Sequence, residues 1–393
     1  MKQCYIEDVE NKEVIDMKSQ YNPLFETVQL PNGIEIRNRF VLAPLTHCSS
    51  NDDGTISDEE LPYIEKRSAD VGIAITAASN VQEEGKAFPG QPSIARDSDI
   101  GGLKQQVARM KKHGAKAVIQ IHHGGSKSLP SLVPNKDVMA PSATYEMSSF
   151  TNEKYHARNM SSEEIESAIR AFGEATRRAI EAGFDGVEIH GANHYLLHQF
   201  VSRTYNRRAD EWKADLKFPL AVVDEVLRVV KLHATAPFIV GYRFSPEDPE
   251  DTGISMEQTE ALVQSLVERK LDYLHVSLFD LNSKVRRGQY AGRTRIDVIQ
   301  HWVGDHLPLI GIGSIFSADQ ALSALDYGIA FVGLGRELLL DPRFVEKIQA
   351  GKESEVINFF DPDREDKHEL PEYLWKQFRN GMYPLPKKQS NDK

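Results

Sequence analysis

Short apolar runs alternate with longer helical patterns through most of the chain, and this alternation limits its possible folds. Eight runs share this character: FVLA (40–43), GIAIT (72–76), AVIQI (117–121), GVEIH (186–190), FIVGYR (238–243), YLHVS (273–277), LIGI (309–312) and FVGL (331–334). Their unbroken apolar character is typical of parallel strands that are covered on both faces. Eight strand–helix units in succession predict an α/β fold, a (β/α)8 TIM barrel, with a doubly wound open sheet as the alternative.

The segments between these runs carry the end signals of helices. Pairs with capping-box spacing are Ser161 and Glu164, Ser255 and Gln258, and Ser317 and Gln320. Glycines stand where helices are expected to stop, at Gly114, Gly183 and Gly328. Over 162–182 the apolar residues recur at steps of three and four, which predicts a helix that covers a sheet.

Three stretches without this alternation follow the carboxyl ends of predicted strands, at 122–160, 244–254 and 278–293. Barrel enzymes build their active sites at that end of the strands. We therefore expect a single barrel domain over 22–350 with loop insertions on its C-terminal face. Residues 1–21 are interpreted as an N-terminal extension, and 351–393 as a C-terminal extension that packs on the barrel.

Composition excludes several classes of protein. The formal net charge is −11 over 393 residues, without a basic stripe, which argues against a nucleic-acid partner. The two cysteines, Cys4 and Cys48, cannot form a disulfide framework or a four-cysteine metal site. An apolar stretch long enough to span a membrane is lacking. We expect a cytoplasmic protein without a metal site, and the sequence leaves a homo-oligomer open.

Two glycine-bearing turns end the last two predicted strands, GIGS (311–314) and GLGR (333–336). In a barrel, backbone N–H groups at these positions often hold a phosphate, and Arg336 can bind its oxygens in a fork. Phe316 and Leu338 occupy the third glycine position of G-x-G-x-x-G, so a dinucleotide fingerprint is absent. The alternative is that the glycines only permit tight turns.

The stretch DGVEIHGANHYLLHQFVS (185–202) begins as a buried strand and ends in hydrogen-bonding rings and amides. Together with LAPLT (42–46), AVIQIHHGG (117–125), NRRADEW (206–212), VGYRFSPED (240–248) and FVGLGRELLLDP (331–342), it resembles the old yellow enzyme family of FMN-dependent ene-reductases. The motifs follow the family's order across about residues 22–348. The segment at 190–200 is the most distinctive of them.

The resemblance implies tightly bound, non-covalent FMN, with NADH or NADPH as the hydride donor. Residues matching the flavin-ring site are Ala43, Pro44, Leu45, Thr46, Ala78, Gln120 and Arg243, and those matching the phosphate site are Gly313, Ser314, Gly335 and Arg336. Thr46 would bond flavin O4, and Gln120 would offer a donor and an acceptor to N3–H and O2. Arg243 would lie near N1 and O2, where negative charge develops in the reduced ring.

The resemblance also implies a mechanism. His190 and Asn193 would donate hydrogen bonds to a substrate carbonyl, and Tyr195 would give a proton to the α-carbon. Hydride would pass from the nicotinamide to flavin N5, and then to the β-carbon of an activated alkene, in ping-pong order. We interpret Glu188, His194 and His198 as structural and Cys48 as packing. His122 and His123 are open between ligand contact, loop packing and, least favoured, metal binding.

Departures from the family pattern leave alternatives. Ser126 and Lys127 stand where an arginine is usual, and His194 replaces a common glycine, which puts substrate and nicotinamide contacts in question. One alternative is a flavin-free barrel lyase or aldolase that acts on a phosphorylated substrate. Another is a flavin-binding, redox-responsive protein with low turnover.

Overall fold

Eight parallel strands close into a barrel in the computed structural model, which describes residues 17–148, 150–213, 215–381 and 384–387. The strands are β3 (Phe40–Leu42), β4 (Ile73–Ile75), β6 (Lys116–His122), β10 (Gly186–Gly191), β11 (Ile239–Phe244), β12 (Tyr273–Val276), β13 (Leu309–Ile312) and β14 (Phe331–Leu334). Each pairs with the next, β14 pairs with β3, and β6 pairs with β10 to complete the circle. The predicted TIM barrel is confirmed, and the open sheet is wrong.

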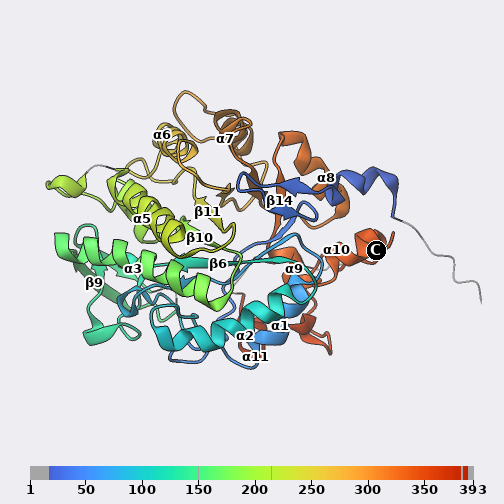
Figure 1. The fold of residues 1–393 in the computed structure, drawn as a ribbon, viewed down its shortest axis with the longest axis horizontal. Helices are drawn as coiled ribbons and strands as arrows, with labels where there is room; N and C mark the ends of the chain where they lie inside the picture. Colours follow the sequence, from blue (N-terminus) through green and yellow to red (C-terminus); the bar gives the residue numbers. More distant parts are fainter. Residues whose placement is uncertain (1–16, 149, 214, 382–383, 388–393) are drawn as a thin grey trace, which may run out of the picture.

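Helices surround the barrel (Figure 1). Those that follow the barrel strands are α1 (Glu60–Ser68), α2 (Ile100–Lys111), α3 (Ser162–Ala182), α5 (Lys217–His233), α6 (Met256–Val267), α7 (Arg295–Val303) and α8 (Ala318–Ala324). The other α-helices are α4 (Leu196–Val201), α9 (Arg336–Leu340), α10 (Phe344–Gln349) and α11 (Glu372–Arg379). The predicted helix over 162–182 matches α3, whose stripe from Ile165 through Phe172 to Ala179 is buried.

Two of the three predicted capping boxes form. Ser161 with Glu164 and Ser255 with Gln258 each exchange both capping hydrogen bonds at the starts of α3 and α6. At α8, Ser317 accepts from the Gln320 backbone, but the Gln320 side chain accepts from the Phe316 N–H at 2.7 Å instead. The third box is therefore incomplete, because the side chain turns to the residue before the cap.

The amino ends of the strands enclose a small apolar core. Val41, Ile73, Val118 and Ile310 pack there with Ile36 from the hairpin of β1 (Val28–Gln29) and β2 (Glu35–Ile36). A larger core lies between the strands and the surrounding helices. Because the hairpin packs against the amino end, the carboxyl end is left for a cavity.

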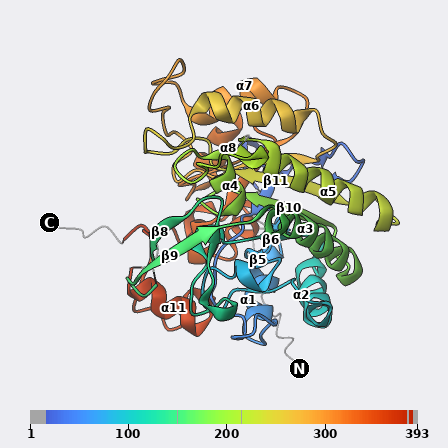
Figure 2. The ribbon, with the colours of Figure 1, turned by 90° about the vertical axis from the view of Figure 1, so that its left-hand side faces the viewer.

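The insertion at 122–160 is more ordered than the sequence indicated. Three strands form a small sheet with β9 in the middle: β7 (Met139–Ala140), β8 (Thr144–Met147) and β9 (Lys154–Asn159). Figure 2 shows β8 and β9 to one side of the barrel. These strands escaped prediction because β7 has two residues, β8 has four that alternate polar and apolar, and β9 is mostly polar, so none of them gives an apolar run.

Both ends of the described chain pack on the barrel. The 3-10 helix η1 (Ser19–Phe25) is anchored by the Tyr21 hydroxyl, which donates to Asp319 of α8 at 2.7 Å. The C-terminal part holds α1 through Arg67, which donates to the His368 carbonyl at 3.1 Å. The division into extensions and barrel domain stays a prediction, and Cys4 lies outside the described residues. Within the described ranges, every helix is too short or too polar to cross a membrane.

Candidate active site

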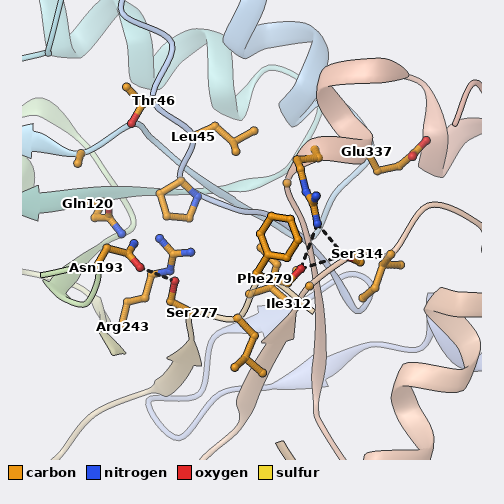
Figure 3. A pocket seen from close by; sticks show the side chains of 18 of the residues that line it. Leu45, Thr46, Gln120, Asn193, Arg243, Ser277, Phe279, Ile312, Ser314 and Glu337 are labelled. Atoms are coloured by element: carbon orange, nitrogen blue, oxygen red, sulfur yellow. Dashed lines mark hydrogen bonds between the residues drawn. The ribbon is translucent and has the colours of Figure 1, made fainter. Parts of the chain in front are cut away.

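A cavity of about 380 Å³ opens at the carboxyl ends of the barrel strands (Figure 3). Its volume falls within the range of small-molecule sites, and its place is the one that barrel enzymes use. The predicted site residues that line it are Pro44, Leu45, Thr46, Ala78, Gln120, His190, Asn193, Tyr195, Arg243, Gly313, Ser314, Gly335 and Arg336. Ala43 does not line it, because this residue is buried and its N–H continues the pairing with β14 at Leu334.

His190 presents one defined hydrogen-bond donor. Its Nδ1 accepts from the Ala192 N–H at 3.2 Å, so in the neutral ring the proton resides on Nε2. Burial, assisted by His122 and Arg243, lowers the pKa of His190 well below its ordinary value. The imidazole is therefore a neutral Nε2–H donor.

Asn193 is fixed in orientation by two hydroxyls. Its Oδ1 accepts from Ser277 at 2.9 Å and from Ser245 at 3.3 Å, and its N–H donates to Ser245 at 2.9 Å. The residue has φ 58, a left-handed conformation that asparagine tolerates better than most residues. Because both hydroxyls are bound to Oδ1, the amide group Nδ2 remains to donate. Ser245 and Ser277 follow β11 and β12, and neither was predicted as a partner of Asn193 from the sequence.

Tyr195 lies against a small apolar cluster at the cavity wall. Cys48, Ala78, Ala87 and Phe88 form this cluster, and burial raises the pKa of Tyr195 to about 12. Burial also raises the pKa of the Cys48 thiol to about 12, in keeping with a packing role. The phenol is thus a protonated group at neutral pH.

A buried polar network lies beneath the cavity around Glu188. Its carboxylate accepts from Gln120 at 2.7 Å and from the Tyr273 hydroxyl at 3.1 Å, and lies 2.9 Å from His275 Nδ1. Burial opposes ionisation, but His275, Arg243 and Gln120 together hold the pKa of Glu188 below its usual value. This carboxylate therefore orients Gln120 and offsets part of the charge of Arg243.

The opposite end of the cavity is built around Arg336. Its guanidinium donates to Ser314 Oγ at 2.7 Å and to the carbonyls of Phe279 and Pro384 at 3.0 and 2.9 Å. The group also lies 4.2 Å from the centre of the Phe279 ring. Next to it, burial and Asp341 raise the pKa of Glu337 well above its usual value, which favours a neutral acid that does not repel an anion.

The two glycine turns differ in what they permit. A Cβ at Gly313, which has φ 142, would lie 2.5 Å from the Leu281 backbone nitrogen, so the turn itself requires glycine. At Gly335 a Cβ would meet only side chains of Ile312 and Leu45, at 3.5 and 3.6 Å. Tight-turn geometry explains Gly313, whereas Gly335 leaves room at the cavity for a ligand.

Several other histidines and the insertion lie around this site. His122 and His123 are buried, their Nδ1 atoms lie 3.0 Å from Gln91 Nε2 and the Gly125 N–H, and neither lines the cavity, which favours loop packing. Ser126 and Lys127 contact Glu146 of β8 at 2.6 and 2.5 Å. The ammonium charge of Lys127 is therefore neutralised by the insertion.

Comparison with known proteins identifies the family. The model of the NADH:flavin oxidoreductase / NADH oxidase family matches residues 23–355. The chain belongs to this family. The probable NADH-dependent flavin oxidoreductase YqiG of Bacillus subtilis (strain 168) is 49% identical over 376 residues, covering 95% of this chain and 100% of that protein. Membership confirms the resemblance to the old yellow enzymes, the oxidoreductase class, and FMN with NADH or NADPH as cofactors.

One further relative and one solved structure are also similar to this chain. The NADH:fumarate oxidoreductase of Klebsiella pneumoniae (strain 342) is 36% identical over 363 residues, which are 90% of this chain but 38% of that protein. The structure of morphinone reductase in complex with tetrahydroNAD superposes with a TM-score of 0.72 at 24% identity, covering 94% of this chain and 99% of that one. The second comparison shows that the barrel fold is shared.

The cavity suits FMN in the distribution of its polar groups. Arg336 and Ser314 offer a cation and a hydroxyl at one end, beside the open space at Gly335. Gln120 and Arg243 line the other end, where Figure 3 shows them close to Asn193. A phosphate tail and a polar flavin edge need donors at opposite ends of one cavity, and this arrangement provides both.

Proposed function

We propose that the protein is an FMN-dependent NAD(P)H:alkene oxidoreductase that reduces alkenes activated by a carbonyl group. The observation that carries this proposal is the convergence of three proton-bearing groups, His190 Nε2, Asn193 Nδ2 and the Tyr195 phenol, on one cavity. The fumarate oxidoreductase relative is consistent with it, because fumarate is an alkene flanked by carboxyl groups. Membership of a flavin oxidoreductase family argues against the flavin-free lyase or aldolase.

The cofactor roles are assigned by position in the cavity. Arg336, Ser314, Gly313 and Gly335 would hold the phosphate, and Pro44, Leu45, Thr46, Ala78, Gln120 and Arg243 would surround the ring. Ala43 would support this loop through its backbone. When bound, FMN supplies hydride transfer, taking a hydride from the nicotinamide and giving it to the β-carbon of the alkene in ping-pong order.

Two neutral hydrogen-bond donors would polarise the carbonyl group of the substrate. His190 Nε2–H and Asn193 Nδ2–H would donate to the carbonyl oxygen and stabilise the negative charge that grows there. Both are held by protein contacts before substrate arrives, so little reorganisation is needed. Because His190 is neutral, it would donate a hydrogen bond to the oxygen without transferring its proton.

Tyr195 would supply the proton at the α-carbon. Its phenol is protonated at neutral pH because burial raises its pKa to about 12. A weak acid of this kind is suited to an enolate, whose α-carbon is a stronger base than water. The proposal therefore separates the two halves of the reaction, since Tyr195 acts only with the alkene.

Anaerobic stopped-flow measurements with the FMN-loaded protein test this function. NADH or NADPH should bleach the flavin absorbance, and 2-cyclohexenone, fumarate and acrylate should then be tried as oxidants. Rapid return of the flavin absorbance with at least one alkene is expected. Slow bleaching by both nucleotides, or reduced flavin that no activated alkene reoxidises, would favour the low-turnover redox-responsive protein instead.

A further inference from the structure

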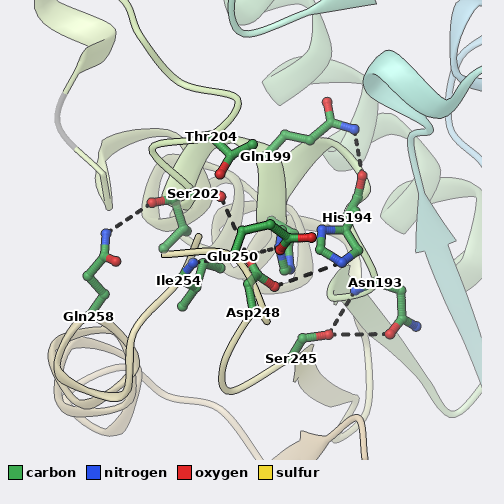
Figure 4. Close-up of polar contacts among 12 residues, drawn as sticks. Asn193, His194, Gln199, Ser202, Thr204, Ser245, Asp248, Glu250, Ile254 and Gln258 are labelled. Atoms are coloured by element: carbon green, nitrogen blue, oxygen red, sulfur yellow. Dashed lines mark hydrogen bonds and ion pairs between the residues drawn. The ribbon is translucent and has the colours of Figure 1, made fainter. Parts of the chain in front are cut away.

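A second polar cluster lies beside the cavity, separate from the groups proposed to touch FMN and substrate. It consists of His194, His198 and Asp248 (Figure 4). His194 directly follows Asn193, His198 lies on α4, and Asp248 lies in the loop after β11. One potential ligand atom from each residue lies within 4.8 Å of the other two.

The separations within this cluster are close to those around a tetrahedral metal ion. His198 Nε2 lies 3.1 Å from Asp248 Oδ2, and His194 Nε2 lies 3.9 Å from Asp248 Oδ1. Zinc bonds of about 2.0–2.1 Å in tetrahedral geometry place ligand atoms about 3.3 Å apart. One observed separation is shorter than that value and the other is longer, and they involve different oxygens of Asp248, so side-chain rotations would be needed to bring the three ligand atoms around one ion.

The imidazole of His194 has unused bonding capacity. Among the described residues, neither of its ring nitrogens has a hydrogen-bond partner, and Nδ1 is buried. His198 is fully buried, and its Nδ1 also lacks a partner within the described ranges. Polar groups in such surroundings are normally paired with protein, water or an ion. Both rings can therefore turn without breaking a hydrogen bond at Nδ1.

Asp248 is buried and held in place by its own loop. Its Oδ2 accepts hydrogen bonds from the Ile254 N–H at 2.9 Å and from the Ser202 hydroxyl at 3.4 Å, so the carboxylate is already fixed beside the two imidazoles.

We propose that His194, His198 and Asp248 form a binding site for one divalent transition-metal ion, with zinc the best match. Two imidazoles and one carboxylate are a known ligand set for zinc with an open fourth position. The exposed Glu250, two residues beyond Asp248, and water are available for that position. The site goes beyond the proposed alkene reduction and does not depend on it.

The site would join two loops that position Asn193. His194 and Asn193 are adjacent, while Asp248 shares its loop with Ser245, which bonds the backbone and side chain of Asn193. A bound ion would cross-link the loop after β10 to the loop after β11. Metal occupancy is therefore expected to change the rate of the alkene half-reaction by holding Asn193.

Metal titration of the FMN-loaded chain, made without a polyhistidine tag and treated with a chelator, tests the site. Zn²⁺ binding is measured by calorimetry, and Co²⁺ by the visible absorption bands of tetrahedral cobalt. One ion per chain is expected. His194→Asn, which suits the left-handed backbone at φ 61, should weaken binding by at least about tenfold, the low end of what even supporting residues of metal sites cost.

The matched control is His233→Gln, an exposed histidine at the end of α5, which should bind as the unaltered chain does. Absence of one-to-one binding, or equal binding by His194→Asn, would overturn the site and leave a structural His198–Asp248 pair. Asp248→Asn gives a second variant, checked by FMN content for correct folding. Because binding is measured without alkene, failure here and failure of alkene reduction are distinguishable.

Discussion

The two ends of the cavity are held in different ways. At the end proposed for the flavin ring, Gln120, His190 and Arg243 stand on barrel strands, are buried, and belong to one polar network. At the end proposed for the phosphate, Arg336 and Ser314 follow strand ends and contact Phe279, whose side chain is 64% exposed, and Pro384 from the C-terminal part. Strand-borne groups are positioned more rigidly than loop-borne ones. Chemistry and cofactor retention should therefore respond to different substitutions.

The largest effect is expected from Tyr195→Phe. Removal of the hydroxyl should slow the alkene half-reaction by about 10²-fold or more, since general-acid catalysis contributes that much. Reduction of FMN by NAD(P)H should stay nearly unchanged, because no proton is delivered to an alkene in that step. Stopped-flow traces of the two half-reactions measure both effects.

Retained FMN content is the control for Tyr195→Phe. Equal slowing of both half-reactions would mean that Tyr195 is not an acid that acts only in the alkene half-reaction.

Arg336→Ala tests the other end. Loss of charged hydrogen bonds to a phosphate costs about 1.5–3 kcal/mol, so the Kd for FMN should rise by roughly 10- to 100-fold. Equilibrium dialysis or fluorescence titration of the flavin-stripped protein measures this. At saturating FMN, both half-reactions should keep nearly their original rates. Unchanged FMN affinity would remove Arg336 from the phosphate site.

The fold could be predicted from the sequence more completely than the details of the site. Strands such as β6 and β11 were predictable because burial on both faces demands unbroken apolar runs. β8 was missed because it has only four residues and its apolar side chains, Tyr145 and Met147, are exposed and not buried, and the incomplete cap at Ser317 depends on a side-chain rotation.

Long-range contacts set the limit within the site. Every site residue predicted from the family motifs lines the cavity except Ala43, but Ser277, Phe279 and Pro384 also line it and were not predicted. The hydrogen bond from Ser277 to Asn193, and those from Gln120 and Tyr273 to Glu188, join strands far apart in the sequence. Only the closed barrel brings these partners together, so Glu188 appeared merely structural in the sequence.

Glu188→Gln would show how far this network tunes the ring end. Its negative charge opposes the charge of Arg243, so neutralising it should stabilise a reduced, negatively charged flavin. A charge several ångströms away is worth on the order of 1 kcal/mol at the effective dielectric of a protein, or about 20 mV for a two-electron couple. Potentiometric titration of the bound FMN should therefore show an upward shift of that size.

A fall in potential, with FMN content and thermal unfolding unchanged, would mean that the hydrogen bonds of Glu188 matter more than its charge. Glu337→Gln is a matched control, because this buried carboxyl is held neutral and its replacement removes no charge. The reduction potential of FMN bound to Glu337→Gln should equal that of FMN bound to the unaltered chain.

The smallest effect is expected from pH at the ring end. Burial raises the pKa of Tyr195 to about 12 and lowers that of His190 well below its usual value. The phenol keeps its proton until the pH approaches about 12, and the imidazole stays neutral above its lowered pKa. The rate of the alkene half-reaction should therefore not change between about pH 6 and pH 9.

At the phosphate end, FMN binding should weaken as pH falls through about 6, where a phosphate monoester takes up its second proton. Single-turnover rates and FMN Kd values across one pH series test both statements. An ionisation near neutral pH in the alkene step, still present in Tyr195→Phe, would assign that pH dependence to another group and break the contrast between the two ends.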